Sequence, residues 1–433
     1  MQSDKFFATM LICAMVLSGL LLTACQAEPI LPTLAAPAAV AELGTTAGET
    51  AVSPQNSASI PVTFTPGAAN QSGANLDNIA PLSPSKTPSP VPTFATYTPR
   101  PTHTATPTVT PDVTAVPTRY QSNLPSLPPS SELGPSKLGV HVVRNNNVNI
   151  MEFVRQAQPA VMKGVDDLGF LEEVKQVSPR TITIGRLSAR DQTYVGEPEE
   201  TARDFVAYQL EQYLANPYVD YWEGWNEPDP NLDRMDWYAR FEAERVRLLA
   251  QHGLKTAVGG FATGVPEMDE FELFIPAIEA AIEHGGILSL HEYGAPDMMF
   301  LYGDPLPGFP TYPDRGSLTF RYRWYYRDIL EPRGLVLPLV ISEAGIDGII
   351  GLGRPGPAGH GWADFSDYWV QQGLGSSGVE AFIKQLNWYD NGVREDGYVI
   401  GFTVFTAGGI AQWREYDINH ILPDLANYVI SQR

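Results

Sequence analysis

Short apolar runs alternate with amphipathic stretches from residue 137 to the end of the 433-residue chain. The apolar runs have the length and the β-branched content of buried strands, and the stretches between them carry apolar residues at helical spacing. The predicted strands span residues 138–143, 160–165, 181–187, 218–226, 255–260, 287–293, 337–343 and 399–406. The predicted helices span residues 150–158, 168–177, 201–215, 233–252, 269–284, 318–330, 379–391 and 422–431.

Eight strands that alternate with helices over roughly 300 residues are typical of one (β/α)8 barrel, the TIM-barrel class of α/β fold. The alternative is an open, doubly wound sheet. Such sheets usually have fewer strands, and no glycine-rich dinucleotide turn follows the first strand here. We therefore expect residues 137–433 to form a single barrel domain.

The N-terminus has the features of a processing signal. Lys5 precedes an apolar run from Phe6 to Leu22, and the run leads into Leu22-Thr23-Ala24-Cys25. Small residues before such a cysteine are typical of a bacterial lipoprotein, in which residues 1–24 are removed and the Cys25 thiol carries lipid. The alternatives are an ordinary secretory peptide or an N-terminal anchor helix. The lipoprotein interpretation predicts a protein of the cell envelope, attached to the membrane through Cys25 alone and exposed outside the cytoplasm.

Residues 25–136 form a low-complexity segment that contains more than half of the chain's 38 prolines, many in Thr-Pro and Ser-Pro steps. Proline cannot donate to a sheet, and there are too few large apolar residues to offset the entropy lost on ordering. We expect a disordered Pro/Thr/Ser-rich tether that holds the barrel away from the membrane.

Charge and cysteine content exclude several classes of protein. The net charge is −21, and most of it falls on residues 137–433, so we expect no nucleic-acid partner. The only cysteines are Cys13 and Cys25, which excludes a disulfide framework in the mature chain. The seven histidines show no close ligand spacing, so we expect no metal and no cofactor. We also expect a monomer.

Three predicted strands end in residues that could carry chemistry. The fourth leads into Trp225-Asn226-Glu227-Pro228, the sixth ends in His291-Glu292-Tyr293, and the seventh ends in Ser342-Glu343-Ala344-Gly345. In a (β/α)8 barrel the carboxyl ends of all strands meet at one face, where the active site lies. We therefore expect these side chains to gather there.

These motifs resemble those of the clan A retaining glycoside hydrolases. The segment "YWEGWNEPD" is similar to the acid/base strand of family 39, "VISEAG" to the nucleophile strand, and "HEY" to the His-x-Tyr strand of family 5. The resemblance covers most of residues 137–433. It implies a retaining glycosidase that hydrolyses an oligo- or polysaccharide, with Glu227 as acid/base and Glu343 as nucleophile.

The same resemblance implies roles for neighbouring residues. Asn226 would bind the sugar 2-hydroxyl, Tyr293 would contact Glu343 through its hydroxyl, and His291 would line the floor of the site. In such a pair the charge on Glu343 is expected to raise the pKa of Glu227.

Other inward positions could serve either the site or the core. Glu223 and Arg186 could pair across neighbouring strands, and His141 on the first strand presents the same choice. Sugar rings stack on aromatic side chains, which makes the aromatic residues of the strand ends and loops candidate walls. These candidates are Trp222, Trp225, Phe300, Tyr302, Trp362 and Trp413.

One departure from the clan concerns the eighth strand. Many clan members end this strand with a tryptophan beneath the sugar, whereas the present strand ends Val404-Phe405-Thr406. Phe405 or Trp413 would have to take that place. The family and the details of the sugar subsite therefore stay open.

Two alternatives to a hydrolase remain. A non-catalytic carbohydrate-binding lipoprotein on a decayed barrel would have no use for two opposed carboxylates. A transglycosylase would use the same residues, and only its products distinguish it.

The anchor interpretation predicts that Cys25→Ser releases the protein from membranes or leaves it unprocessed, because the lipid-bearing thiol is lost. Detergent partitioning of the expressed protein measures this. Cys13→Ser, which changes the only other cysteine, is the matched control and should partition as the unaltered protein does. Normal processing with unchanged partitioning of Cys25→Ser would contradict the assignment.

Overall fold

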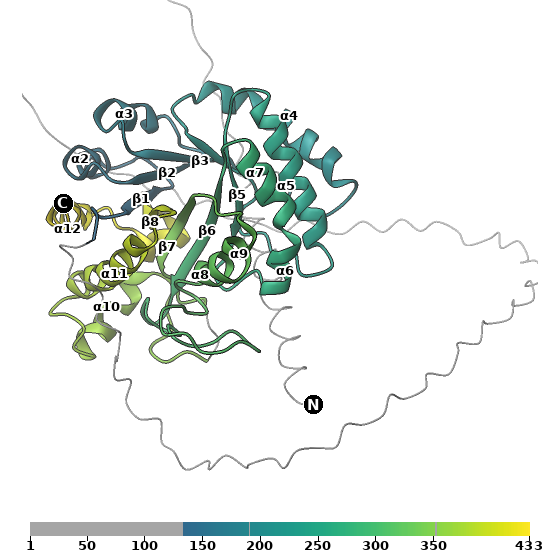
Figure 1. Ribbon diagram of the computed structural model, residues 1–433. Coiled ribbons are helices and arrows are strands. Elements are labelled where there is room, and N and C mark those ends of the chain that lie inside the picture. The colour runs from purple at the N-terminus through teal and green to yellow at the C-terminus, as the bar shows by residue number, and fades with distance from the viewer. Residues whose placement is uncertain (1–132, 190, 351–352) are drawn as a thin grey trace, which may run out of the picture. The chain divides into compact units, whose positions relative to one another are not determined.

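Eight parallel strands close into a barrel in the computed structural model, which describes residues 133–189, 191–350 and 353–433. Each strand pairs with the next, and β8 pairs with β1 (Figure 1). The strands are β1 (Leu138–Val142), β2 (Val161–Val165), β3 (Ile182–Arg186), β4 (Tyr221–Glu223), β5 (Thr256–Phe261), β6 (Ile287–Gly294), β7 (Leu339–Ile346) and β8 (Val399–Ala407). The predicted (β/α)8 barrel is confirmed. The predicted signal peptide, Cys25 and nearly all of the tether lie outside the described residues.

Helices surround the barrel, as the order of the sequence predicts. They are α2 (Val148–Ala157), α3 (Phe170–Val177), α4 (Pro198–Ala215), α5 (Met235–Ala250), α6 (Met268–Leu273), α7 (Ile275–Glu283), α8 (Tyr322–Tyr325), the π-helical turn η2 (Tyr326–Leu330), α9 (Glu331–Arg333), α10 (Trp362–Gln371), α11 (Gly378–Glu395), the 3-10 helix η3 (Ala411–Tyr416) and α12 (Leu422–Ser431). The predicted helix 269–284 is divided into α6 and α7 at Phe274, because Pro276 starts a new helix rather than continuing one. No helix is predicted between the seventh strand and residue 379, but α10 lies in this segment.

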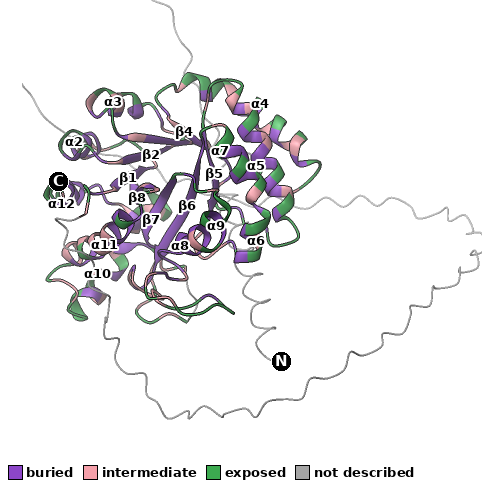
Figure 2. Ribbon diagram, in the orientation of Figure 1, coloured by how far each residue is buried: buried purple, intermediate pink, exposed green. Residues whose placement is uncertain are grey.

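Burial divides the barrel into an outer and an inner layer. The strands are almost entirely buried, and the helices expose only their outer faces (Figure 2). A separate apolar cluster is formed by one residue from each of five strands, namely Val161, Ile184, Ala257, Ile287 and Val340. Because residues from strands on opposite sides can meet only in the interior, this cluster fills the barrel toward the amino ends of the strands. Polar side chains occupy the interior above it.

A buried ion pair fixes helix α5 against β4 and β5. Arg245 contacts Glu242 through two bonds of 2.7 and 2.8 Å, and it also donates to the backbone carbonyls of Trp222 and Ala257. Gly224 makes the close approach possible, because a Cβ there would lie 2.7 Å from the Glu242 carboxylate. The pair thus holds the strand that leads into Asn226 and Glu227.

Glu292 anchors β6 from the outside of the barrel. Its carboxyl group accepts bonds from the backbone N–H groups of Phe320 and Tyr322 and from the Tyr389 hydroxyl, at 2.7 to 3.0 Å. Burial raises the pKa of Glu292 to about 7, although these donors act in the opposite direction. The neighbours of Glu292 on the strand, His291 and Tyr293, therefore face the interior from a fixed backbone.

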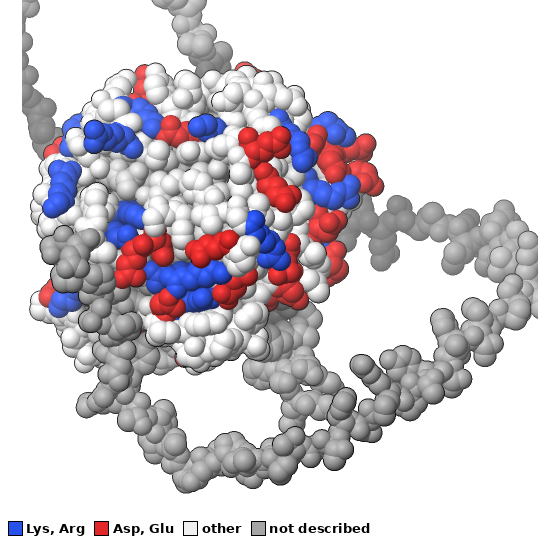
Figure 3. All heavy atoms as spheres, viewed as in Figure 1, with Lys and Arg blue, Asp and Glu red and all other residues white. Residues whose placement is uncertain are grey.

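Charged side chains of both signs are interspersed on the surface seen in Figure 3, over α4 and α5 among other elements. Arg240 on α5, for example, pairs with Glu199 on α4 at 2.9 Å. Within the described residues, no helix combines the length and the apolar character needed to cross a bilayer.

Removal of the Arg245 guanidinium should destabilise the barrel strongly, because Glu242 would be left as a buried charge without its partner. We expect Arg245→Met to lower the free energy of unfolding by about 3–5 kcal/mol. Equilibrium denaturation in urea measures the change.

Arg247→Met on the same helix is the matched control. Arg247 pairs with Glu244 at 3.8 Å, and half of its side chain is exposed, so we expect a change of at most about 1 kcal/mol. Equal losses in the two variants would show that the buried pair has no special role.

Candidate active site

The sequence motif "WNEP" leaves the barrel directly after β4. The strand ends at Glu223, and Glu227 has a left-handed backbone with φ of 48°, stabilised by a 3.0 Å bond from its N–H to the Gly260 carbonyl. Gln192 holds the turn from the other side, since its amide exchanges two 2.7 Å bonds with the backbone of Asn226. This turn points the Glu227 side chain back over the barrel mouth, where 40% of it stays exposed.

A bulge on β7 places Glu343 inside the barrel. Leu290 pairs with Ile341 but His291 pairs with Glu343, so Ser342 is an extra residue on β7. Adjacent residues of a regular strand face opposite sides, whereas here Ser342 and Glu343 both contact interior side chains. Only 6% of the Glu343 side chain is exposed.

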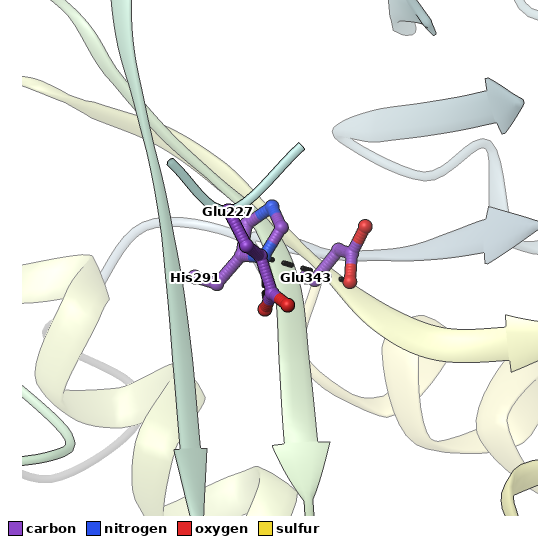
Figure 4. A group of neighbouring side chains, drawn as sticks. All are labelled: Glu227, His291 and Glu343. Atoms are coloured by element: carbon purple, nitrogen blue, oxygen red, sulfur yellow. Dashed lines mark hydrogen bonds and ion pairs between the residues drawn. The ribbon is translucent and has the colours of Figure 1, made fainter. Parts of the chain in front are cut away.

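The two predicted carboxylates meet across His291. The His291 Nδ1 atom lies 3.0 Å from a carboxylate oxygen of Glu227 and 3.6 Å from one of Glu343 (Figure 4). One ligand atom from each of the three residues lies within 4.8 Å of the other two. The structure therefore brings Glu227 and Glu343 together at one end of the barrel, as expected.

Other predicted residues complete the surroundings of Glu343. The Tyr293 hydroxyl donates to Oε2 at 2.9 Å, and Arg186 Nη1 donates to Oε1 at 3.1 Å. Arg186 also bonds the side-chain oxygen of Asn226. His141 Nε2 lies 3.5 Å from Oε1, while its Nδ1 is bonded to Thr406 at 2.7 Å.

Lys163 on β2 is a site residue that the sequence analysis missed. Its ammonium group donates to Glu343 Oε1 at 2.9 Å and forms an ion pair with Glu223 at 2.8 Å. The signal was available, because Lys163 is two residues from Val161 and shares its inward face. The expected pairing of Arg186 with Glu223 is weaker, at 3.9 Å.

These contacts set the charges of the site. Burial alone would raise the pKa of Glu343, but its electrostatic interactions with neighbouring groups, first His291 and then Lys163, hold that pKa well below its usual range. Burial is likewise outweighed at Glu223, where Lys163 and Arg186 lower the pKa to about 2. Burial, with the charge of Glu343 beside it, raises the pKa of Tyr293 well above its usual range, so this hydroxyl remains a donor.

Two of the predicted aromatic walls lie at the mouth. Phe405 packs against the rings of His141 and Tyr293, with centroids 4.7 and 6.1 Å apart, and Trp413 packs on Phe405 at 5.2 Å. Trp413 is only partly buried. This cluster therefore lies beside His141 and Tyr293, two of the residues that surround Glu343.

Three other candidate walls are corrected by the structure, and one of them, Trp222, is 0% exposed and packs on Tyr213. Trp225 is 1% exposed and packs among Trp237, Tyr238 and Phe241, and Trp362 is 3% exposed and stacks on Phe382. Since their faces are covered by protein, they contribute to packing rather than to a sugar-binding surface.

Glu227, His291 and Glu343 have the residue types and spacing of a metal site. However, Lys163 and Arg186 lie 2.9 and 3.1 Å from Glu343, and two adjacent cations repel a divalent ion. The arrangement therefore fits a carboxylate whose charge is neutralised by protein cations better than a carboxylate that binds a metal ion.

No protein-family model matches the sequence, and no curated protein matches it. Among solved structures, a β-glucuronidase from Faecalibacterium prausnitzii is 13% identical, with a TM-score of 0.37, over 68% of this chain and 49% of its own. An endo-1,4-β-D-mannanase from Thermotoga petrophila is 11% identical, with a TM-score of 0.35, over 67% of this chain and 99% of its own.

A triple mutant of an endo-β-1,4-glucanase from Xanthomonas axonopodis pv. citri is 10% identical, with a TM-score of 0.37, over 68% of this chain and 99% of its own. The chain spans about half the length of the glucuronidase and of a matched protein from Neocallimastix frontalis. Because all these identities and TM-scores are low, the function has to follow from the chemistry of the site.

The surroundings of His141 predict that it stays neutral near physiological pH. Burial lowers the pKa of His141 to about 4 and outweighs the attraction of Glu343, so the ring should gain a proton only in acid. Its imidazole NMR signals should not shift between about pH 5.5 and 8, the range in which an unperturbed histidine titrates. His141→Gln identifies the signals, and a midpoint near 6.5 would contradict the expected effect of burial.

Proposed function

We propose that this chain is a retaining glycoside hydrolase of the clan A type, with Glu227 as acid/base and Glu343 as nucleophile. The observation that carries the proposal is the approach of the two carboxylates across His291 at one barrel mouth, with ligand atoms within 4.8 Å. Retaining glycosidases have carboxyl groups about 5–5.5 Å apart, whereas inverting enzymes need about 6.5–9.5 Å to admit a water. The spacing supports retention.

The different surroundings of the two carboxylates support the two roles. Glu343 is buried and held as an anion by Lys163 and Arg186, as a nucleophile requires. Glu227 is the more exposed of the pair and lies outside the strand, where a leaving group and a water could both reach it.

The reaction would proceed in two displacements. A Glu343 oxygen attacks the anomeric carbon, the bond to the glycosidic oxygen breaks, and that oxygen takes the proton of Glu227. A water then gives a proton to Glu227 while its oxygen attacks the anomeric carbon, and Glu343 leaves as a carboxylate. Each step forms one bond to the anomeric carbon and breaks another.

Neighbouring groups would hold the sugar. The Asn226 side-chain oxygen is engaged by Arg186, so its amide group is the part that could donate to the sugar 2-hydroxyl. Phe405 and the partly exposed Trp413 would supply the apolar wall for the C–H face of the ring.

We also propose, from the sequence alone, that the barrel acts outside the cytoplasm at the end of a tether anchored through lipid on Cys25. The substrate would then be an extracellular oligo- or polysaccharide.

Substitution of each glutamate should separate their roles on a dinitrophenyl glycoside that the unaltered protein cleaves. Glu343→Ala removes the nucleophile, so activity should fall by several orders of magnitude. Glu227→Ala removes proton transfer only, and dinitrophenolate leaves without a proton, so the first step should survive and the glycosyl-enzyme should accumulate. Burst kinetics and the mass of the intact protein measure this.

Azide distinguishes the assignments further, because it attacks without a base. It should rescue Glu227→Ala and yield a glycosyl azide of retained configuration. Rescue of Glu343→Ala with inverted product would show that the roles are exchanged. Unchanged rates in both variants would place the site elsewhere, and transfer of the sugar to added acceptors instead of water would indicate a transglycosylase.

A further inference from the structure

Polar side chains continue below Glu343 into the closed interior of the barrel. Lys163 donates to the Ser342 hydroxyl at 3.2 Å and to Glu343 Oε1 at 2.9 Å, and it forms a 2.8 Å ion pair with Glu223 Oε2. Ser289 joins the other side of the network: its hydroxyl donates to Glu223 Oε1 at 2.6 Å, and its oxygen lies 2.9 Å from the Ser342 hydroxyl. All of these residues are buried. Solvent therefore screens the charges of this network only weakly.

Two buried carboxylates and two buried cations face one another in this interior. Glu223 and Glu343 are two anions, and Lys163 and Arg186 are two cations that both lie within 4 Å of each anion. His141 is uncharged near neutral pH, because burial lowers its pKa to about 4. The contact of Lys163 with Glu223 is an ion pair rather than a well-directed hydrogen bond. Glu223 thus acts on Lys163 chiefly through charge.

The two oxygens of Glu343 have different partners. Oε1 is held by Lys163 and Arg186, at 2.9 and 3.1 Å, from the side of β2 and β3. Oε2 accepts the Tyr293 hydroxyl and lies 3.6 Å from His291, whose same nitrogen contacts Glu227. Oε2 is therefore the oxygen on the side of the acid/base, and Oε1 is the anchored oxygen.

We propose that Lys163 and Glu223 form a charge-compensating pair that positions Glu343, with Oε1 anchored by the cations and Oε2, on the side of Glu227, as the attacking oxygen. The attacking role of Oε2 rests on the proposed function, whereas the positioning of Glu343 does not require turnover. Lys163 is a positioning residue, and Glu223 acts through it.

The pair has a consequence for the reaction cycle. When Glu343 forms a bond to the anomeric carbon its charge vanishes, and without Glu223 two buried cations would remain with no counter-charge. At that stage Glu223 remains as the counter-charge of Lys163. Oε1 becomes the carbonyl oxygen of the ester, and the cations on it favour the return of Glu343 to the carboxylate in the second displacement.

The decisive experiment titrates Glu343 directly in the intact protein by 13C NMR of glutamate labelled at the side-chain carboxyl, with Glu343→Gln to identify the signal. Lys163→Met removes a cation and leaves Glu223 as an uncompensated like charge, so the Glu343 midpoint should rise by about one to three pH units. Lys163→Arg keeps the charge, so its Glu343 midpoint should lie close to that of the unaltered protein. The groups that face Glu343 and remain unchanged in these variants are His141, Arg186, Glu227, His291 and Tyr293.

The double variant Lys163→Met/Glu223→Gln is the sharpest test. If Glu223 acts as the counter-charge of Lys163, removal of both charges should bring the Glu343 midpoint back toward that of the unaltered protein. If the two residues have a purely structural role, the second substitution should disturb the surroundings of Glu343 further. A Glu343 midpoint in the double variant at or above that of Lys163→Met would therefore overturn the proposal. An unchanged midpoint in Lys163→Met would also overturn it.

Glu223→Gln alone covers the case in which Lys163→Met does not fold. Two cations then face one anion, so formation of the glycosyl-enzyme should slow by at least about tenfold, and the burst with a dinitrophenyl glycoside should shrink. An unchanged burst would contradict the role of Glu223. The two proposals can fail separately. If the protein cleaves no glycoside, the proposed function fails, while the titration of Glu343 still tests the Lys163–Glu223 pair. If glycosides are cleaved but the Glu343 midpoint does not shift, only the proposal on the pair fails.

Discussion

The negative charge of Glu343 in the buried interior of the barrel is the constraint on which the rest of the site depends. A buried carboxylate is costly unless positive groups lie against it, and here they come from strands β2 and β3. Those cations require a second carboxylate, which β4 supplies as Glu223. Because each group belongs to a different strand, closure of the barrel is what brings the two anions and the two cations together.

The same closure explains which parts of the site the sequence could predict. The strands were found from their apolar runs, and the positions of Glu343, His291 and Tyr293 followed because carboxyl ends of parallel strands share one face. Lys163 was overlooked although it obeys the alternation of β2. A lysine interrupts the apolar pattern of a buried strand, and its role becomes clear only when its two carboxylate partners are known. Those partners lie 60 and 180 residues away in the sequence.

Failures of alternation account for the remaining errors. Trp225 would face inward with Glu223 if β4 continued, but the strand ends at Glu223, and the tryptophan turns toward α5 instead. Glu343 reaches the interior only because Ser342 is an extra residue on β7. Neither the end of a short strand nor the position of a bulge can be read from hydrophobic periodicity, since both depend on pairing with neighbouring strands. Trp362, a candidate wall, instead begins helix α10 in a segment where no helix is predicted, and its ring stacks on Phe382.

The division between a rigid interior and a freer rim matches what the proposed chemistry asks of each glutamate. Glu343 would change its charge without exchanging protons with water, and it is enclosed by groups from four other strands. Glu227 would exchange a proton in both steps, and it is held through its backbone at Gly260, by Gln192, which bonds the neighbouring Asn226, and by one contact to His291. His291 is the one described residue whose ring nitrogen touches both carboxylates. In the proposed reaction, a change of charge on Glu343 would therefore reach Glu227 through its contact with His291 as well as through space.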